Sequence, residues 1–181
     1  MAARSSSRAS LLLGSTASAW IVWAADAVTP GDLGHGIVPR TIYGLTGIVM
    51  APFLHANLQH LLANTIPFVI LGAVILLRGA RAFTFVAVVS ALIAGAGTWL
   101  FGTPGTMHIG ASGVVFGFFG YLLFRALYDR RISSFLIALV VAVLYGGSLL
   151  MSIIPAQGIS WSGHLFGFIG GITAARMRYG R

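Results

Sequence analysis

HIGASGVVFGFFG, residues 108–120, holds a serine between glycines at the start of an apolar segment. Gly113, Gly117 and Gly120 recur through that segment at helical spacing. Small residues at this spacing let two membrane helices pack with their backbones close together. The stretch therefore predicts a helix that begins at Ser112 and presents a glycine ridge to a neighbouring helix. Because GxxxG patterns are frequent in membrane helices, the ridge by itself indicates packing and no function.

Two further segments place polar side chains at the start of apolar runs. HANLQHLLAN contains His60 and Asn64, which lie one turn apart on the same face of a helix. WSGHLFGFIGG places His164 at the start of the last apolar run, which has a small-residue ridge of its own. If the two ridges face each other, Ser112 and His164 come close together. The glycines expected at this helix contact are Gly110, Gly113, Gly117, Gly163, Gly167 and Gly171.

Composition indicates that these segments lie in a membrane. Of the 181 residues, 57% are hydrophobic and 8% are charged, and the mean hydropathy is +0.93. A soluble domain has about 25% charged residues, so the composition excludes a soluble enzyme, a disordered tail and an ordinary nucleic-acid-binding protein. Six apolar runs have about the length that a spanning helix needs. We therefore predict an all-α membrane bundle, a single domain over residues 1–181, with spans at roughly 11–28, 58–77, 82–101, 112–128, 133–153 and 162–177.

The first apolar run permits an alternative interpretation. A basic start, an apolar stretch and Ala17-Ser18-Ala19 are similar to a signal peptide with its cleavage site. The apolar run continues past that site through Trp20 and Trp23, which favours a helix that is retained. The one sizeable loop follows at 29–57 and contains several glycine and proline residues that break helices.

Arginine placement indicates the orientation in the membrane. All 11 basic residues are arginines, and ten of them flank the spans on one side, with only Arg40 on the other. Basic residues concentrate on the cytoplasmic side of membrane proteins, so we predict that both termini are cytoplasmic. The lysine-free, arginine-rich composition is typical of a GC-rich bacterial genome, which points to a bacterial plasma (inner) membrane. In this orientation all three polar motifs lie at the outer ends of their helices.

The serine and the histidine at these outer ends suit nucleophilic catalysis. His164 would take the proton of Ser112 and later donate it to the leaving amine. The backbone N–H of Ser112, at a helix N-terminus, and the side chains of His60 and Asn64 would stabilise the oxyanion. None of the three aspartates lies in these motifs. The pattern therefore predicts a Ser–His dyad and no triad.

Taken in order, these pieces resemble the rhomboid family of intramembrane serine proteases. The resemblance rests on GASG around Ser112, on His60 and Asn64 with His55 five residues earlier, and on GHLFGFIGG around His164. With six spans in this order, it covers nearly the whole chain. It implies a serine endopeptidase that cuts single-span transmembrane substrates in a water-filled cavity open to the outer side.

The same resemblance assigns roles to individual residues. It implies that Ser112 is the nucleophile, His164 the base, and His60 and Asn64 oxyanion contributors. Many family members carry a tyrosine four residues after the nucleophile, stacked on the catalytic histidine; Phe116 stands there in this chain and predicts stacking without a hydroxyl contact. No cofactor, metal or nucleic-acid partner is expected, and membrane lipids surround the protein.

The first loop departs from the family pattern. Members with a long structured first loop often hold a Trp–Arg pair in it. Here the loop contains Arg40 and no tryptophan, so the resemblance does not determine the loop's conformation.

The remaining histidines have simpler interpretations. We expect His35 and His108 to be solvated loop residues and His55 to be a structural hydrogen-bonding group. A zinc site built from His55, His60, His108 and His164 is disfavoured, because no HExxH motif or nearby carboxylate accompanies them.

Two other classes of function are also disfavoured. Rhomboid relatives that act as membrane chaperones or dislocation factors lack the dyad, whereas this chain has both Ser112 and His164. A small transporter would place polar residues near the midplane and often contains internal repeats. This sequence gathers its polar residues on one side and contains no evident repeat.

Overall fold

The fold is a bundle of long helices that correspond to the predicted apolar runs. The computed structural model describes residues 2–29, 35–154, 156 and 158–180. Within these ranges the only β-structure is an isolated bridge between Ile37 and His108. This confirms the predicted all-α fold class. The long helices are α1 (Ala2–Val28), α3 (Leu58–Leu76), α4 (Ala80–Phe101), α5 (Ser112–Asp129), α6 (Ile132–Ile153) and α7 (Trp161–Tyr179).

Three of these helices are long and apolar enough to cross a membrane by length and composition. They are Arg8–Val28, Leu58–Leu76 and Ala80–Phe101. The other three are shorter in their apolar part or carry charges near their ends, as α7 does with Arg176 and Arg178. Large apolar side chains nevertheless stay exposed along α6, including Phe135 at 63% and Val143 at 76%. Exposed apolar surface of this kind suits contact with lipid, and the protein is an integral membrane protein.

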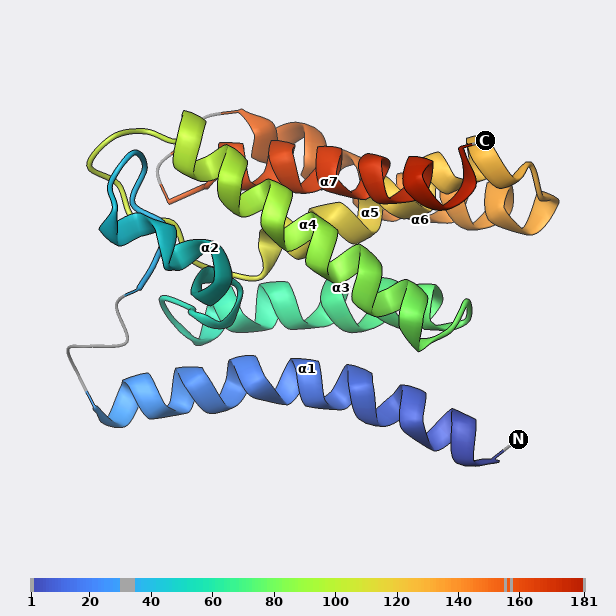
Figure 1. Cartoon of the computed structure of the whole chain (residues 1–181), viewed down its shortest axis with the longest axis horizontal. Helices are drawn as coiled ribbons and strands as arrows, with labels where there is room; N and C mark the ends of the chain where they lie inside the picture. Colours follow the sequence, from blue (N-terminus) through green and yellow to red (C-terminus); the bar gives the residue numbers. More distant parts are fainter. Residues whose placement is uncertain (1, 30–34, 155, 157, 181) are drawn as a thin grey trace.

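The loop between α1 and α3 contains three short helices, η1 (Tyr43–Leu45), α2 (Gly47–Met50) and η2 (Ala51–Phe53). Part of the predicted loop, 30–34, lies outside the described residues. The loop folds back on itself so tightly that a methyl group at Gly47 would overlap the backbone of Gly36. The described part of the loop lies at the same end of the bundle as the connection between α4 and α5 (Figure 1).

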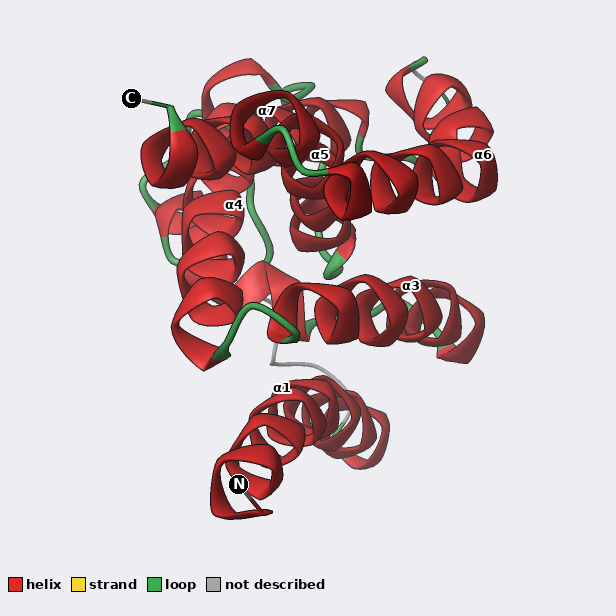
Figure 2. Ribbon diagram, turned by 90° about the vertical axis from the view of Figure 1, so that its right-hand side faces the viewer, coloured by secondary structure: helices red, strands yellow, loops and turns green. Residues whose placement is uncertain are grey.

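Helix α5 occupies the centre of the bundle. It packs most extensively against α7 and also contacts α3, α4 and α6. Helices α1 and α6 lie at the periphery, with α1 beside α3 (Figure 2). The first residues of α1 and the last residues of α7 lie at the same end of the molecule (Figure 1).

Glycines allow α5 and α7 to approach closely. A methyl group at Gly167 would overlap the carbonyl of Gly113, and one at Gly171 would overlap the carbonyl of Gly117. The two small-residue ridges therefore face each other with backbone against backbone. Gly163 differs, because a methyl group there would lie 2.8 Å from the Ser160 hydroxyl and so would press on the cap of its own helix.

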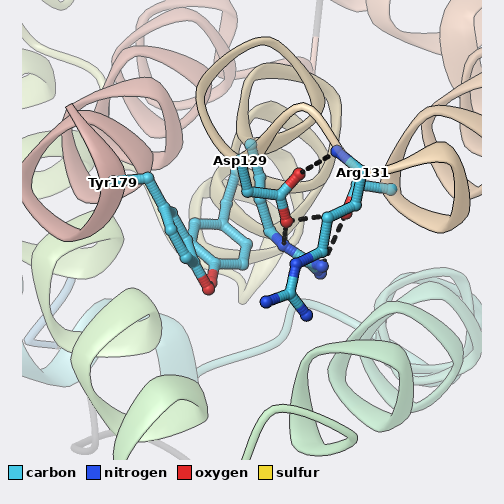
Figure 3. Close-up of polar contacts among 6 residues, drawn as sticks. Asp129, Arg131 and Tyr179 are labelled. Atoms are coloured by element: carbon cyan, nitrogen blue, oxygen red, sulfur yellow. Dashed lines mark hydrogen bonds and ion pairs between the residues drawn. The ribbon is translucent and has the colours of Figure 1, made fainter.

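A buried ionic cluster joins α5 to the start of α6, beside the end of α7 (Figure 3). Arg125, which is 1% exposed, donates from Nε to the Asp129 carboxylate at 2.9 Å and from a terminal nitrogen to Ser134 Oγ at 2.7 Å. Ser134 in turn donates to Asp129 at 2.7 Å. Alongside, the hydroxyls of Tyr121 and Tyr179 lie 3.3 Å apart. The cluster fastens the start of α6 to α5 and lies beside the last residues of α7.

Candidate active site

Ser112 is the first residue of α5, and the turn before it is held by the first loop. Gly110 donates its N–H to the carbonyl of Ala51 at 2.8 Å, and Ala111 donates to His55 Nε2 at 3.4 Å. Gly110 has φ +115°, a conformation that L side chains rarely adopt. A Cβ there would also lie 2.6 Å from His60 Nε2. Gly110 was predicted at a helix contact, and the structure places it in this turn because only glycine fits there.

His164 lies one turn into α7, at the level of Ser112. Ser160 caps α7 by accepting the N–H of Gly163 at 3.3 Å, and the carbonyl of Ser160 accepts the N–H of His164 at 3.0 Å. The His164 side chain is 9% exposed, and its Nε2 lies 2.9 Å from Ser112 Oγ. Two residues that are 52 positions apart in the sequence are thus within hydrogen-bonding distance.

The second nitrogen of His164 determines which way the proton is shared. His164 Nδ1 lies 3.1 Å from the backbone carbonyl of Ser152, near the end of α6. A carbonyl oxygen can only accept, so Nδ1 carries the hydrogen, and Nε2 of the neutral ring accepts the hydroxyl proton of Ser112. This is the tautomer that a general base requires. A backbone carbonyl takes the orienting position that a carboxylate fills in a triad.

Phe116 lies one turn after Ser112, and its ring stacks on the His164 imidazole. The ring centroids are 4.3 Å apart and the planes differ by 29°. The imidazole is therefore held on three sides, by the Phe116 ring, the Ser152 carbonyl and the Ser112 hydroxyl.

His60 and Asn64 line the same cavity as the serine and the histidine. The cavity has a volume of about 1280 Å³ and is bordered by α3, α5, α6 and α7. Asn64 donates one amide hydrogen to the carbonyl of His60 at 3.1 Å. The amide has a second hydrogen that can serve a ligand in the cavity. One cavity is thus lined by the Ser112 hydroxyl, the imidazoles of His60 and His164 and the Asn64 side-chain amide.

His55 is a structural hydrogen-bonding residue in this site. It is 4% exposed, and its ring meets that of His60 edge to face at a centroid distance of 5.1 Å. Burial, and to a lesser degree the neighbouring His60, lower the pKa of His55 to about 4. The ring is therefore neutral near pH 7 and can accept the N–H of Ala111.

The other two loop histidines differ from each other. His35 is exposed, as expected. The expectation that His108 is solvated is wrong, because its ring is half-buried and lies 2.8 Å from Ser160 Oγ and 2.8 Å from Thr106 Oγ1. Among the residues that the structure describes, no three histidine, aspartate, glutamate or cysteine side chains form a group that could hold a metal ion.

The first loop, which has Arg40 but no tryptophan, is bound to Trp99 of α4. The Arg40 guanidinium donates to the carbonyls of Leu100 and Gly102 at 2.7 and 3.1 Å, at the end of α4. Trp99 of α4 donates from Nε1 to the carbonyl of Thr41 at 2.8 Å. The loop is therefore docked by an arginine and a tryptophan from two elements. In the sequence, Trp99 lies near the end of an apolar run, where it can reach a loop, and this position is what could have indicated the contact.

Comparison with known proteins places this architecture in a family. The rhomboid domain model matches residues 43–181. An uncharacterized protein of Mycobacterium tuberculosis is 43% identical over 149 residues, which cover 78% of this chain and 62% of that protein. An uncharacterized protein of Mycobacterium leprae is 44% identical over 140 residues, or 72% of this chain and 55% of that protein.

A relative whose name refers to an activity comes from Bacillus subtilis. YdcA, which is named as a candidate rhomboid protease, is 34% identical over 119 residues, or 65% of this chain and 59% of that protein. The aligned part of the chain spans less than two thirds of the length of each of these three relatives. With the family model matching most of its residues, the chain belongs to the rhomboid family.

Proposed function

We propose that the protein is an intramembrane serine endopeptidase that hydrolyses peptide bonds in single-span transmembrane substrates, with Ser112 as nucleophile and His164 as base. The observation that carries this proposal is the 2.9 Å separation between Ser112 Oγ and His164 Nε2. The bond from His164 Nδ1 to the Ser152 carbonyl supports it, because that bond leaves Nε2 free to accept a proton. Membership of the rhomboid family supports the same activity.

In this mechanism Ser112 Oγ attacks the scissile carbonyl carbon while its proton passes to His164 Nε2. The imidazolium that forms donates from Nδ1 to the Ser152 carbonyl and is stabilised there. His164 then protonates the leaving amine, which departs and leaves an acyl-enzyme on Ser112. A water molecule, deprotonated by the same histidine, hydrolyses the ester and restores the serine.

The negative oxygen of the tetrahedral intermediate requires donors on the same wall. The backbone N–H of Ser112 suits this role, because the first N–H groups of a helix have no intrahelical partner. The second amide hydrogen of Asn64 and the ring of His60 line the same cavity and complete the set. The Asn64 amide is oriented by its hydrogen bond to the His60 carbonyl, and the His60 ring lies against the His55 ring.

The proposed topology has both termini in the cytoplasm of a bacterium and the cavity open to the outer side. The start of α1 and the end of α7 lie at one end of the bundle (Figure 1). In the sequence, ten of the 11 arginines lie near the two chain termini or in and beside the α3–α4 and α5–α6 connections. Reporter fusions after residue 181 and within the first loop test this orientation. A C-terminal reporter that is active only outside the cytoplasm would contradict it.

The activity is tested with purified protein in detergent and a generic single-span substrate. We expect cleavage by the parent protein and none by Ser112→Ala, together with labelling of the parent at Ser112 by a fluorophosphonate. Unchanged cleavage by Ser112→Ala, or inhibition by a metal chelator, would overturn the proposal. An intact protein that binds but never cuts such substrates would indicate a non-proteolytic member of the family.

A further inference from the structure

His108 is a polar residue beside the site that the proposed mechanism does not use. Its backbone exchanges two hydrogen bonds with Ile37 of the first loop, each of 2.9 Å. Its ring reaches the other way, with Nδ1 2.8 Å from Ser160 Oγ and Nε2 2.8 Å from Thr106 Oγ1. The ring packs closely, because a Cβ built on Gly102 would lie 3.1 Å from Nε2. One residue therefore joins the first loop, the connection before α5 and the start of α7.

The partners of the ring determine the direction of its hydrogen bonds. Thr106 donates its hydroxyl hydrogen to the carbonyl of Thr103 at 2.6 Å, so Thr106 Oγ1 accepts from His108 Nε2–H. In a neutral ring Nδ1 is then the acceptor, and Ser160 donates its hydroxyl hydrogen to it. The Ser160 oxygen keeps a lone pair for the N–H of Gly163. A continuous, directed chain of hydrogen bonds thus runs from Gly163 through Ser160 and His108.

These hydrogen bonds join the segments that precede the two proposed catalytic residues. Ser160 is the N-cap of α7, and Gly163 immediately precedes His164. His108 stands four residues before Ser112, in the segment that leads into α5. The hydrogen bond between His108 and Ser160 therefore connects the first turn of α7, which carries the proposed base, to the segment that leads to the proposed nucleophile.

We infer that His108 is a positioning residue, which holds the cap of α7 against the segment before α5 and so sets the separation of Ser112 and His164. The inference rests on the proposed function. The ring's hydrogen bonds are with Ser160 and Thr106, so His108 acts on the dyad through Ser160 and not by a hydrogen bond to the reacting atoms. A misplacement of reacting groups by about 1 Å can lower the rate roughly 10²-fold.

The bundle itself is held by other contacts. From Gly167 onward the ridges of α5 and α7 interlock, and near the far end the hydroxyls of Tyr121 and Tyr179 lie 3.3 Å apart. The first turn of α7, which contains His164, packs less tightly on α5, because a Cβ built on Gly113 would lie 3.3 Å from the Gly163 carbonyl and would not overlap it. Loss of the His108 ring should therefore loosen the first turn while the helices stay assembled.

The test compares His108→Ala, His108→Asn and the matched control His35→Ala in purified protein. We expect His108→Ala to lower kcat by roughly 10–10²-fold, with KM nearly unchanged and slower fluorophosphonate labelling of Ser112. His108→Asn should recover much of the rate, because its Oδ1 can accept the Ser160 hydroxyl as Nδ1 does. His35 is exposed, so His35→Ala should match the parent.

A second variant tests the link between the two residues. Ser160→Ala should lower kcat about as much as His108→Ala, and the double variant should lose little more than either single one. Additive losses would overturn the linkage. Full kcat in His108→Ala would overturn the inference. So would a fall in kcat that is accompanied by a lower thermal unfolding temperature and that His108→Asn does not recover.

Ser112→Ala in the same assay separates the inference from the proposed function. If Ser112→Ala still cleaves the substrate, the proposed function fails, whatever His108→Ala does. If Ser112→Ala is inactive and His108→Ala has full kcat, only the positioning role fails.

Discussion

The two ends of α5 use their polar groups in different ways. At one end Arg125 and Asp129 form a buried ion pair that Ser134 completes. At the other end Ser112 and His164 share one hydrogen bond between neutral groups, beside a cavity of about 1280 Å³. Permanent charge is thus paired where the bundle is fastened. At the proposed site a charge develops only when the histidine takes a proton.

This difference separates stability from activity. A buried charge that loses its partner is strongly unfavourable, so changes in the ionic cluster should act on folding. The serine and the histidine line the cavity and carry no charge in the resting state. Changes there should act on the reaction and leave folding nearly intact, and the following variants probe that contrast.

The largest effect is expected for the dyad. Ser112→Ala, His164→Ala and the double variant should each lower kcat by a factor on the order of 10⁴–10⁶, because residues that act as a unit lose activity non-additively. Substrate cleavage measures the loss, and thermal unfolding in detergent should stay close to that of the parent. A double variant that is far less active than either single variant would show that the two residues act independently.

At the ionic end the effect should fall on stability. Asp129→Ala leaves the buried Arg125 without its counter-ion and should destabilise the protein by about 3–5 kcal/mol. Ser134→Ala, which keeps both charges, should cost only about 1 kcal/mol. Unfolding by heat or denaturant in detergent measures both. A folded Asp129→Ala protein with parental stability would show that the cluster does not fasten the bundle.

A donor of the oxyanion hole should have an intermediate effect. Asn64→Ala should lower kcat by roughly 10²–10³-fold if the amide is a principal donor. A smaller loss would indicate that the Ser112 backbone and His60 share the role. An unchanged rate in the double variant His60→Ala, Asn64→Ala would remove α3 from the mechanism.

The smallest effect is expected for the stacked ring. Aromatic contacts of this kind contribute about 0.5–1.5 kcal/mol, so Phe116→Ala should lower turnover by up to about tenfold through a less well-held imidazole. Phe116→Tyr, which keeps the ring, should remain near the parental rate. Full turnover in Phe116→Ala, with normal expression, would show that the ring does not position His164.

Much of this protein follows from local features of the sequence. The length and apolar character of the runs predict the helices, since a membrane requires both in one continuous segment. Glycine spacing predicts which helices can approach closely, because the absence of a side chain is itself a local property. Because Ser112 and His164 each lie beside one of these glycine ridges, the sequence also predicted that the two residues would lie close together.

Other features are decided only when distant segments meet. The Ser152 carbonyl that orients His164 is a backbone atom, and a backbone atom has no residue-type signature. The tryptophan that docks the first loop comes from α4, and the partner of His108 lies 52 residues away. Gly110 was expected between helices and is needed in a turn, because its φ of +115° depends on how the first loop packs. Sequence determined which chemical groups the bundle could bring together, whereas the tertiary structure decided which atoms hold them in place, since hydrogen bonds between distant segments depend on distance and direction.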